Sequence, residues 1–435
     1  MSKFSKVPLG KASLSIIDGD RGANYPKKTE FFAKGHCWFL NTSNVKSVGF
    51  DFGEMDFITA EKDAALSKGK LRRHDIVLTT RGTIGNCAYF GEDIPFENIR
   101  INSGMVVLRA DPSQLNPYFL YAFLRSEIFK IQTGTHSSGS AQPQLPIVAL
   151  RNIVIPLFEL PHQRKIAAVL SALDAKIALN QRINLELEGL AKLLYDYWFV
   201  QYDFPLSAAQ AAALGKPRLA GQPYRTSGGK MVYHDQLKRE IPEGWEVENI
   251  LAISELGGGA TPSKKKAEFW NGKIPFFTPT DAQSEPFCLD TEDHITHEGL
   301  RNSSTRLYGA GALFITARSS VGKAMIISKE MAMNQSCYAL IPREGVGRAF
   351  LYFHTMSLMG FLREKSSGSV FKSIVTNDIK FTPAIVPNSE NLKEFSKFAE
   401  PVFNQILNNQ EQNQELTALR DWLLPMLMNG QVRVG

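Results

Sequence analysis

The chain of 435 residues contains one sequence pattern twice. When residues 35–85 are laid on residues 272–322 without a gap, about ten of roughly fifty positions carry the same residue, a repeat of domain size. The coinciding pairs include Gly35 with Gly272, Phe39 with Phe276, Ile58-Thr59 with Ile295-Thr296, Thr79 with Thr316, Arg81 with Arg318 and Gly85 with Gly322. A period this long is outside the range of solenoids and propellers, so it indicates two copies of one unit. We therefore expect two similar binding sites on one polypeptide.

Each copy ends in a long amphipathic pattern. From Ile166 to Leu194, apolar residues recur close to heptad spacing, and Pro161 lies where a first helical turn accepts proline. A second such pattern runs from Phe395 to Leu423. At 1.5 Å rise per residue, a helix of this kind is about 60 Å long. Because each helix must bury an apolar stripe, we expect an antiparallel coiled coil; the alternative is that each helix packs on its own domain.

Asparagines interrupt both apolar stripes, at Asn180 and Asn184 in the first helix and at Asn409 and Asn413 in the second. Buried asparagines of this kind can fix the register of a coiled coil at a cost in stability. The alternative is that all four side chains are solvated.

The rest of the chain mixes short β-rich runs with a predicted helix near 117–130. We expect an α/β (α+β) fold with an internal pseudo-two-fold repeat. Residues 204–242 are poor in apolar side chains and rich in Pro and Gly, except for an Ala-rich piece at 207–214 that suits a helix. The expected parts are a first domain (1–155), a central helix (156–203), a linker (204–242), a second domain (243–388) and a C-terminal helix (389–435).

Composition narrows the class of protein. No apolar run is long enough to span a membrane, and the first ten residues lack the apolar core of a signal peptide, so we expect no membrane partner. The four cysteines are scattered, which argues against disulfides and a zinc site and favours the cytoplasm. The net charge of +6 is compatible with a polyanionic partner.

Two loops at equivalent places combine glycine with basic residues. Residues 257–266 read GGGATPSKKK, and residues 18–28 read DGDRGANYPKK. Glycine lets the backbone approach a phosphate, Thr and Ser donate hydrogen bonds, and Lys neutralises charge. A plain turn followed by solvated lysines explains the same letters, and the G-K-[ST] ending of a P-loop is absent.

The two copies differ most at their polar loops. Residues 41–44 read NTSN where residues 278–281 read TPTD, and Thr83 stands where Ser320 stands in the second copy. One frame with two sets of polar side chains suits a reader of two different DNA sequences, although drift after duplication also diversifies loops. Arg81 and Arg318 are identical, which favours a phosphate contact or a structural ion pair over base reading.

Catalytic signatures are missing from the sequence. There is no P-loop, no nucleophile elbow, no H-x-x-x-H pair and no glycine fingerprint for a dinucleotide or S-adenosylmethionine. Asn116-Pro117-Tyr118-Phe119 resembles an amino-methyltransferase N-P-P-Y motif without one proline, but the second copy keeps none of its polar letters. We interpret it as a helix start.

Several stretches resemble one family, the specificity subunits of type I restriction–modification enzymes. The stretches that carry this resemblance cover nearly the whole chain: IDGDRGANYP (17–26), LPHQRKIAAV (160–169), YWFVQYDFP (197–205), PYRTSGGKMVY (223–233), LKREIPEGW (237–245), GGATPSKKKAEFWNG (258–272) and IPFFTPTD (274–281). The second helix begins with ENLKE (390–394) and lacks the P-x-x-Q-x-x-I lettering of the first.

The resemblance implies a non-catalytic subunit with two target-recognition domains that read a bipartite, asymmetric double-stranded DNA target. Its helices would space the half-sites by one to two DNA turns and dock two methyltransferase subunits. Restriction subunits would complete the complex. S-adenosylmethionine, ATP and Mg are expected on those partners, and no cofactor or metal is expected on this chain. A methylation-only system and a catalytic DNA methyltransferase or nuclease remain alternatives, as does a protein-binding adaptor.

Loop positions with polar or basic side chains are the predicted DNA contacts. They are Arg21, Asn24, Lys27, Lys28, Asn44, Arg81, Thr83, Ser138 and Gln142 in the first domain, and Thr261, Ser263, Lys264, Thr280, Arg318, Ser320, Ser367 and Lys372 in the second. Among these, Lys264 is expected to bind phosphate, and Gln142 to read a base.

Overall fold

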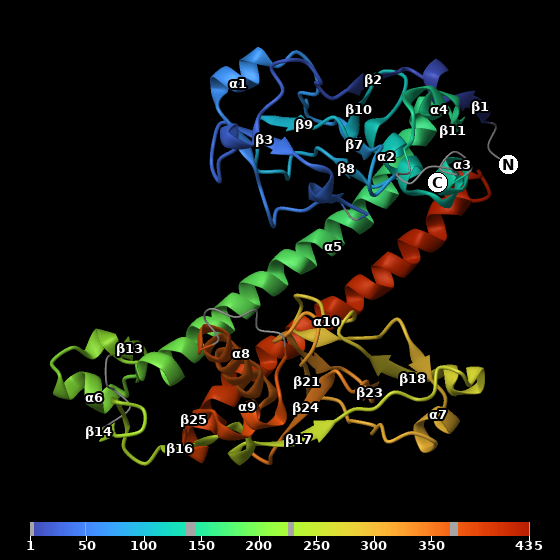
Figure 1. Cartoon of the computed structure of the whole chain (residues 1–435). Helices are drawn as coiled ribbons and strands as arrows, with labels where there is room; N and C mark the ends of the chain where they lie inside the picture. Colours follow the sequence, from blue (N-terminus) through green and yellow to red (C-terminus); the bar gives the residue numbers. More distant parts are fainter. Residues whose placement is uncertain (1–3, 48, 135–143, 225–229, 366–372, 435) are drawn as a thin grey trace. The chain divides into compact units, whose positions relative to one another are not determined.

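The computed structural model describes residues 4–47, 49–134, 144–224, 230–365 and 373–434. The chain forms two compact units (Figure 1). Unit 1 comprises Met1–Ile177 and Glu415–Gly435, and unit 2 comprises Ala178–Gln414. The two long helices, α5 (Leu160–Tyr195) and α10 (Ser389–Met428), each contribute to both units.

The remaining elements of unit 1 mix short strands and helices, as the sequence predicts. They are β1 (Ser5–Pro8), β2 (Leu14–Asp18), β3 (Cys37–Leu40), β4 (Val45–Lys46), β5 (Gly49–Phe50), β6 (Phe57–Ile58), α1 (Ala60–Ala65), β7 (Ile76–Thr79), β8 (Cys87–Tyr89), β9 (Ile99–Ile101), β10 (Met105–Ala110), α2 (Pro117–Arg125), α3 (Glu127–Gly134), α4 (Ile147–Asn152) and β11 (Val154–Leu157).

Unit 2 contains the same kinds of element and a small additional segment at its start. Its elements are β12 (Phe204–Pro205), α6 (Ala208–Ala213), β13 (Pro223–Tyr224), β14 (Met231–His234), β15 (Arg239–Pro242), β16 (Glu246–Asn249), β17 (Ser254–Gly258), β18 (Trp270–Phe277), β19 (Phe287–Cys288), β20 (His294–Ile295), α7 (His297–Arg301), β21 (Leu313–Thr316), β22 (Ala324–Ile327), β23 (Ala332–Met333), β24 (Cys337–Pro342), α8 (Arg348–Lys365), α9 (Thr376–Phe381) and β25 (Pro383–Val386).

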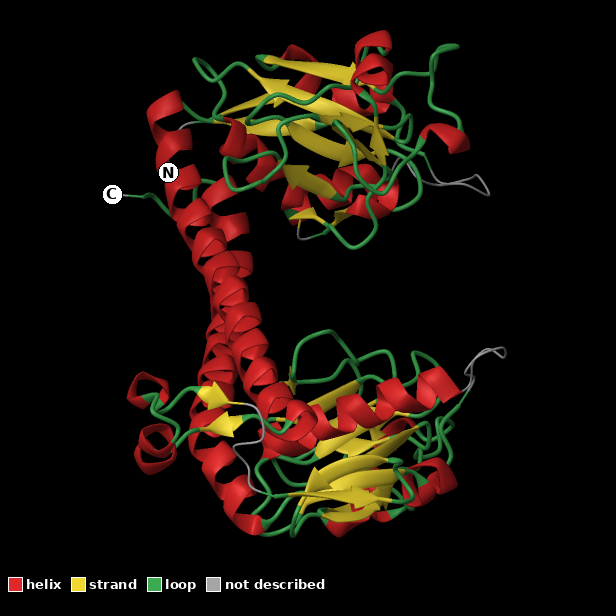
Figure 2. Cartoon of the chain, turned by 90° about the vertical axis from the view of Figure 1, so that its left-hand side faces the viewer, coloured by secondary structure: helices red, strands yellow, loops and turns green. Residues whose placement is uncertain are grey.

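The sheet order repeats between the units. In unit 1 the main sheet runs β2-β10-β7-β8, and in unit 2 it runs β17-β24-β21-β22 with β19 added at the edge. The second sheets, β6-β3-β9 and β20-β18-β23, each join an antiparallel and a parallel pair. Figure 2 shows the main and second sheets of each unit gathered into one body beside the helices. The internal repeat and the mixed α/β class predicted from the sequence are confirmed.

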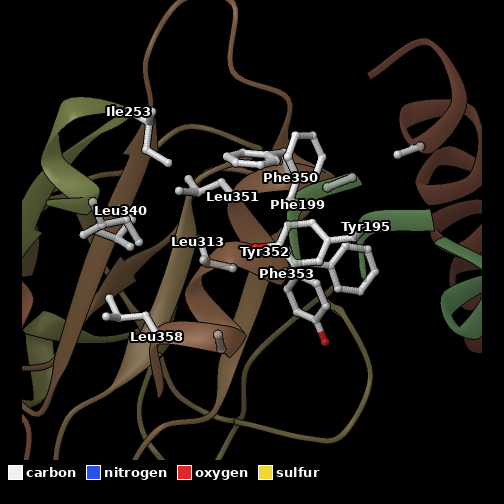
Figure 3. Close-up of a cluster of buried hydrophobic side chains, with 14 of the residues drawn as sticks. Tyr195, Phe199, Ile253, Leu313, Leu340, Phe350, Leu351, Tyr352, Phe353 and Leu358 are labelled. Carbon is white, nitrogen blue, oxygen red and sulfur yellow. The ribbon is translucent and has the colours of Figure 1, made fainter. Parts of the chain in front are cut away.

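Each unit's main core includes the start of one long helix and the end of the other. In unit 1, Ile166 and Leu170 of α5 and Leu427 of α10 are almost fully buried in one cluster with the main sheet. In unit 2, Tyr195 of α5 and Phe199, in the π-helical turn that follows it, lie in one cluster with Phe350 and Phe353 (Figure 3). Phe395 of α10 belongs to the same cluster. The ring of Phe199 lies 4.8 Å from that of Phe350 and 5.1 Å from that of Phe395, which are favourable edge-to-face distances.

The long helices also contact each other, in antiparallel order. Within unit 1, Asp174 of α5 pairs with Arg420 of α10 at 2.9 Å. Within unit 2, Asn180 Nδ2 donates to Asn413 Oδ1 at 2.9 Å, and Asn409 Nδ2 donates to Asn184 Oδ1 at 2.8 Å. The antiparallel pairing is therefore confirmed. The alternative that each helix packs on its own domain is correct only for the start of each helix, because each end packs in the core of the other unit.

The asparagine contacts obey the pseudo-two-fold relation. The repeat aligns Asn180 with Asn409 and Asn184 with Asn413, so the two hydrogen bonds are equivalent under exchange of the helices. Asn180 is 1% exposed and Asn409 is 7% exposed. These side chains are buried rather than solvated, and a paired amide at a helix interface favours one register over its neighbours.

A buried polar cluster distinguishes unit 1 from unit 2. Asp174 accepts hydrogen bonds from Tyr118 and Arg125, each at 2.6 Å, and from Arg420 at 2.9 Å. Arg125 and the other cluster members hold the pKa of Asp174 below its usual value although burial opposes this. The repeat places apolar residues at the four equivalent positions of unit 2: Ala191, Ala349, Met356 and Phe403.

Local capping explains several element boundaries. Asn116 Oδ1 accepts the N–H of Phe119 at 2.9 Å, and Pro117 occupies the first turn of α2, so 116–119 is a helix start as interpreted. The single helix predicted near 117–130 is wrong in detail. It is divided into α2 and α3 at Ser126, whose extended backbone ends α2 and whose hydroxyl donates to Phe123 O at 2.6 Å.

The missing P-x-x-Q-x-x-I lettering in the second helix has a structural counterpart. In unit 1, Gln163 Oε1 accepts the N–H of Asn116 at 2.8 Å and so ties α5 to the start of α2. In unit 2, Glu400 Oε1 accepts the N–H of Ala349 at 3.0 Å, at the start of α8. In unit 2, Glu400 thus links the long helix to α8, from a position about two turns further along than that of Gln163 in unit 1.

In the expected linker 204–242, the described residues 204–224 and 230–242 form more regular structure than a plain linker. Ser207 caps α6, the predicted Ala-rich helix, by accepting the N–H of Gln210 at 3.1 Å. Phe204 and Leu206 are buried, and β14 pairs with β15. The segment is therefore anchored to unit 2 by its own side chains.

We predict that Asp174→Ala destabilises unit 1 by about 3–5 kcal/mol, because it leaves Arg125 and Arg420, each with a side chain 13% exposed, without their carboxylate. Hydrogen exchange measures this as lower protection of β10 with little change in β24. The exposed Glu127→Ala is the control and should cost less than about 0.5 kcal/mol.

A variant that carries the four residues of unit 2 tests the same cluster from the other side. It combines Tyr118→Ala, Arg125→Met, Asp174→Phe and Arg420→Ala. Replacing a buried ionic cluster by packed apolar residues is often neutral or stabilising, so most of the loss should be recovered. Equal stability of wild type and Asp174→Ala would contradict the cluster's role.

Candidate functional site

The turn between the third and fourth strands of each main sheet is built in the same way. In unit 2, Thr316 Oγ1 donates to Ser320 O at 2.7 Å; in unit 1, Thr79 Oγ1 donates to Thr83 O. Gly85 closes the turn of unit 1 with φ of +91°, and Gly322 closes the other with φ of +81°, a conformation that favours glycine. Arg81 and Arg318 stand at the start of these turns with exposed side chains.

A second loop, which the sequence did not single out, lies beside each turn. The N–H of Arg81 donates to Gly104 O, and the N–H of Arg318 donates to Ser336 O, both at 3.2 Å. Asn102 Oδ1 accepts the N–H of Gly104 at 2.8 Å, and Asn334 Oδ1 accepts that of Ser336 at 2.9 Å. The only sequence signal for these loops is the repeated asparagine, which falls outside the aligned stretch.

Close backbone approach explains the glycines at the ends of β2 and β17. A Cβ on Gly19 would lie 2.2 Å from Asn102 O, and a Cβ on Gly259 would lie 2.2 Å from Asn334 O. At Gly257 a Cβ would lie 2.3 Å from the Tyr308 hydroxyl, which itself donates to Gly258 O at 2.7 Å. The glycine run therefore serves packing between strands, and a phosphate is not needed to explain it.

The loops after β3 and β18 have equivalent internal supports. Asn44 Oδ1 accepts the N–H of Asn41 at 3.0 Å, and Asp281 Oδ2 accepts the N–H of Thr278 at 2.7 Å. Asn44 is 2% exposed, and its Nδ2 donates to Glu54 O at 2.6 Å. This amide holds the loop from inside, so the Asn44 side chain is not available on the surface as the sequence predicted.

These segments come together in each unit. The N–H of Asn102 donates to Leu40 O, and the N–H of Asn334 donates to Phe277 O, both at 3.0 Å. We call the assembled segments the loop cluster. It comprises residues 19–21, 41–44, 80–86 and 102–104 in unit 1, and residues 259–261, 278–281, 317–323 and 334–336 in unit 2. The backbone of Gln144 pairs with Arg81, and that of Ser373 with Arg318, so these residues adjoin it.

Several predicted residues lie in the loop clusters. Arg21 Nη2 pairs with Asp18 at 3.1 Å and donates to Ser103 O at 3.4 Å. Thr261 Oγ1 donates to Gln335 Oε1. Thr280 is exposed, with its hydroxyl 2.6 Å from that of Thr278. The other predicted members, all exposed, are Arg81, Thr83, Arg318 and Ser320.

Other predicted residues lie elsewhere. Asn24 Nδ2 donates to Ala65 O at 3.1 Å, and the N–H of Lys27 donates to Glu30 at 2.8 Å, beside exposed Lys28. Lys264 Nζ lies 5.9 Å from the Trp270 ring, whose N–H donates to Ser263 O at 3.2 Å. Four predicted residues fall outside the described part of the chain: Ser138, Gln142, Ser367 and Lys372.

The chemistry of the described residues is that of binding. Burial raises the pKa of each cysteine thiol to about 12, so none of the four is a thiolate at neutral pH: Cys37, Cys87, Cys288 and Cys337. Across the described ranges, no group of three His, Cys, Asp or Glu residues is placed to hold a metal. The exposed guanidinium, amide and hydroxyl groups of the loop clusters are donors and acceptors suited to nucleic acid.

Among the described residues, no helix combines the length and the apolar character needed to cross a membrane.

Comparison with known proteins gives one family. Residues 16–189 and 242–418 each match the type I restriction modification DNA specificity domain. The chain is 26% identical over 458 aligned residues to the type I restriction enzyme HindI specificity subunit of Haemophilus influenzae, covering 95% of this chain and 98% of that protein. It is 26% identical to the MjaIX specificity subunit of Methanocaldococcus jannaschii, covering 82% and 78% of the two chains.

The fold has a solved counterpart. The crystal structure of the type I restriction-modification system S subunit from M. genitalium superposes with a TM-score of 0.55 at 14% identity, covering 98% of this chain and 96% of that one. At this identity the likeness concerns the fold.

The Asp20 carboxylate makes the stability of the loop cluster of unit 1 depend on pH. This carboxylate accepts the N–H groups of Gly22 at 2.9 Å and Ser67 at 2.8 Å, and these bonds lower its pKa from 3.8 to about 2. Because the folded pKa is depressed, the stabilisation is complete above about 3.8 and is lost as pH falls toward 2.

We predict that Asp20→Asn lowers the free energy of unfolding at pH 7 and that the difference from wild type shrinks between pH 4 and pH 2. Denaturant titrations at several pH values measure the difference. The exposed Glu127→Gln is the control, with little change at any pH. A difference that does not depend on pH would show that the carboxylate charge is not responsible.

Proposed function

Because the chain belongs to the type I restriction modification DNA specificity family, we propose that it reads a bipartite, asymmetric double-stranded DNA sequence for a restriction–modification complex. Unit 1 and unit 2 each read one half-site through their loop clusters. The chain is the recognition subunit and not the catalyst. It acts in the cytoplasm, with the DNA that it reads.

One observation carries this proposal: the loop clusters share a backbone frame and differ in their exposed side chains. The glycines, asparagines and arginines that shape the frame are the same at Gly19 and Gly259, Asn102 and Asn334, and Arg81 and Arg318. In contrast, Arg21 stands where unit 2 has Thr261, and Ser103 where it has Gln335. Side chains that reach base edges decide sequence preference, so unequal side chains on equal frames favour unequal half-sites.

The frame arginines suit the part of DNA that does not vary. Arg81 and Arg318 are exposed and identical, and phosphate contacts carry no sequence information. Exposed lysines in the same units, among them Lys27, Lys28 and Lys264, would add to the attraction for a polyanion. We assign the arginines to phosphates, with the neighbouring loop residues reading bases.

The repeated helices support the proposed partners. Equivalent hydrogen bonds between Asn180 and Asn413 and between Asn409 and Asn184 relate the two helices by a pseudo-two-fold exchange at their seam, and such an exchange would relate their outer surfaces as well. Two copies of one methyltransferase subunit would suit two similar surfaces. Those subunits supply S-adenosylmethionine chemistry, and restriction subunits supply ATP, Mg and cleavage.

An exchange of one domain tests the function. Residues 1–155 are replaced by the matching domain of a relative, and the chimera is produced with the methyltransferase subunit. Mapping of methylated adenines in genomic DNA should show a split motif in which one half changes and the other half and the gap persist. A motif that ignores the exchange, or methylation without a split motif, would contradict the proposal.

We predict that Lys264→Ala weakens binding to all duplexes by a similar factor and makes the salt dependence of log K shallower by about one unit. The reason is the loss of one phosphate neutralisation. The control variant is Lys230→Ala. Lys230 is exposed, lies next to the β14–β15 hairpin and away from Lys264 in the sequence, and its Nζ is 3.3 Å from Glu243 Oε1. Titrations by fluorescence anisotropy at several salt concentrations separate the two. A loss limited to one DNA sequence would assign Lys264 to base reading instead.

A further inference from the structure

The loops before β10 and β24 have equivalent backbone contacts in the two loop clusters but carry different side chains. In both, an asparagine bonds to the N–H two residues later, at 2.8 Å from Asn102 and 2.9 Å from Asn334. In both, the backbone of a glycine that follows the neighbouring strand lies close to the carbonyl oxygen of the asparagine. The residue between the asparagine and its bonding partner is therefore displayed at one fixed place: Ser103 in unit 1 and Gln335 in unit 2.

Gln335 differs from Ser103 in length and in support. Its side chain is exposed, and its Oε1 accepts a hydrogen bond from the Thr261 hydroxyl. Thr261 is half-buried and followed by buried Pro262, so the hydroxyl comes from a packed segment and not from a free surface loop. An amide oxygen has two lone pairs, so Oε1 keeps one acceptor site, and Nε2 keeps its donors.

Unit 1 fills the equivalent place from the other strand. Arg21, at the position of Thr261, extends over the loop to Ser103 O at 3.4 Å and is paired with Asp18 at 3.1 Å. A carboxylate beside a guanidinium reduces the number of its orientations. In each unit one long polar side chain is thus held over the same backbone turn by one partner: Arg21 by Asp18 and Gln335 by Thr261.

We propose that Gln335 is a base-reading residue of unit 2, that Thr261 is its positioning residue, and that the base is adenine. Glutamine binds adenine by donating from Nε2 to N7 and by accepting from the N6 amino group at Oε1. The bond from Thr261 to Oε1 fixes the orientation of the amide, and so the places of its acceptor Oε1 and its donor Nε2. Arg21, which suits guanine, is the counterpart in unit 1. This inference rests on the proposed function and adds to it a residue and a base.

The test measures preference and not only binding. The chain is produced with its methyltransferase subunit, and competition titrations use duplexes in which each base pair of the mapped motif is replaced in turn. Gln335→Ala should reduce discrimination at one adenine of the unit 2 half-site by about ten- to a hundred-fold. Discrimination in the other half-site should stay as in wild type. The exposed Gln283→Ala of the same unit is the control and should leave the motif unchanged.

A change of preference excludes simple misfolding. Gln335→Glu removes the donor to N7 and retains an acceptor, so preference at the same position should move toward cytosine, whose N4 amino group donates. Thr261→Val removes the hydroxyl with little change in shape and should blur the same position, whereas Thr261→Ser should restore it. A structural role for Thr261 would instead lower stability and leave the preferred base unchanged.

The outcomes distinguish a failure of the Gln335 assignment from a failure of the proposed function. A split motif in wild type with unchanged discrimination in both Gln335 variants would overturn the assignment of Gln335 and leave the proposed function standing. A wild-type complex without a split motif would overturn both. If the Gln335 variants instead lost base discrimination in the other half-site, the assignment of Gln335 to the half-site of unit 2 would be overturned.

Discussion

The structure depends on the need to bury the apolar stripes of two long helices. The ends of these helices complete the main cores: Leu427 of α10 lies in the core of unit 1, and Tyr195 of α5 lies in that of unit 2. Neither core consists only of residues from its own sequence repeat. Burial of one large apolar side chain contributes about 1.5–3 kcal/mol, so removing either helix end would expose several such side chains. Each unit therefore closes its core with a helix end that belongs to the other sequence repeat.

The same arrangement allows the binding surface to vary. The loop clusters lie at the ends of strands and contribute little to the hydrophobic cores of the units. Backbone hydrogen bonds and a few side chains, such as Asn102 and Asn334, hold their conformation. Substitution at Ser103 or Gln335 leaves those bonds in place. The buried polar cluster around Asp174 is different, because here the two units differ in buried side chains. One of its members, Arg420, comes from the C-terminal helix. Substitution at displayed loop positions such as Ser103 and Gln335 costs little stability, whereas removal of a single member of the buried Asp174 cluster costs much.

The sequence predicted the larger features because they depend on periodicity. The repeat, the two helices and their antiparallel pairing follow from apolar spacing, and the helix start at Asn116 follows from capping chemistry. The sequence could not show that Asn44 points inward, because an asparagine in a loop suits capping and binding equally. It gave no reason for the break at Ser126. The sequence also could not show that Gln335 lies beside Thr261, because the two residues are 74 positions apart and meet only in the folded chain.

Photo-crosslinking tests the central claim, that one frame presents two different sets of side chains to two half-sites, most directly. Cysteine is introduced at Ser103 or at Gln335, labelled with a photoreactive group, and irradiated in the complex with methyltransferase and target DNA. The account predicts that each position crosslinks to bases of one half-site only, and that the two half-sites are different. Crosslinks from both positions to the same half-site, or from neither position to DNA, would contradict it.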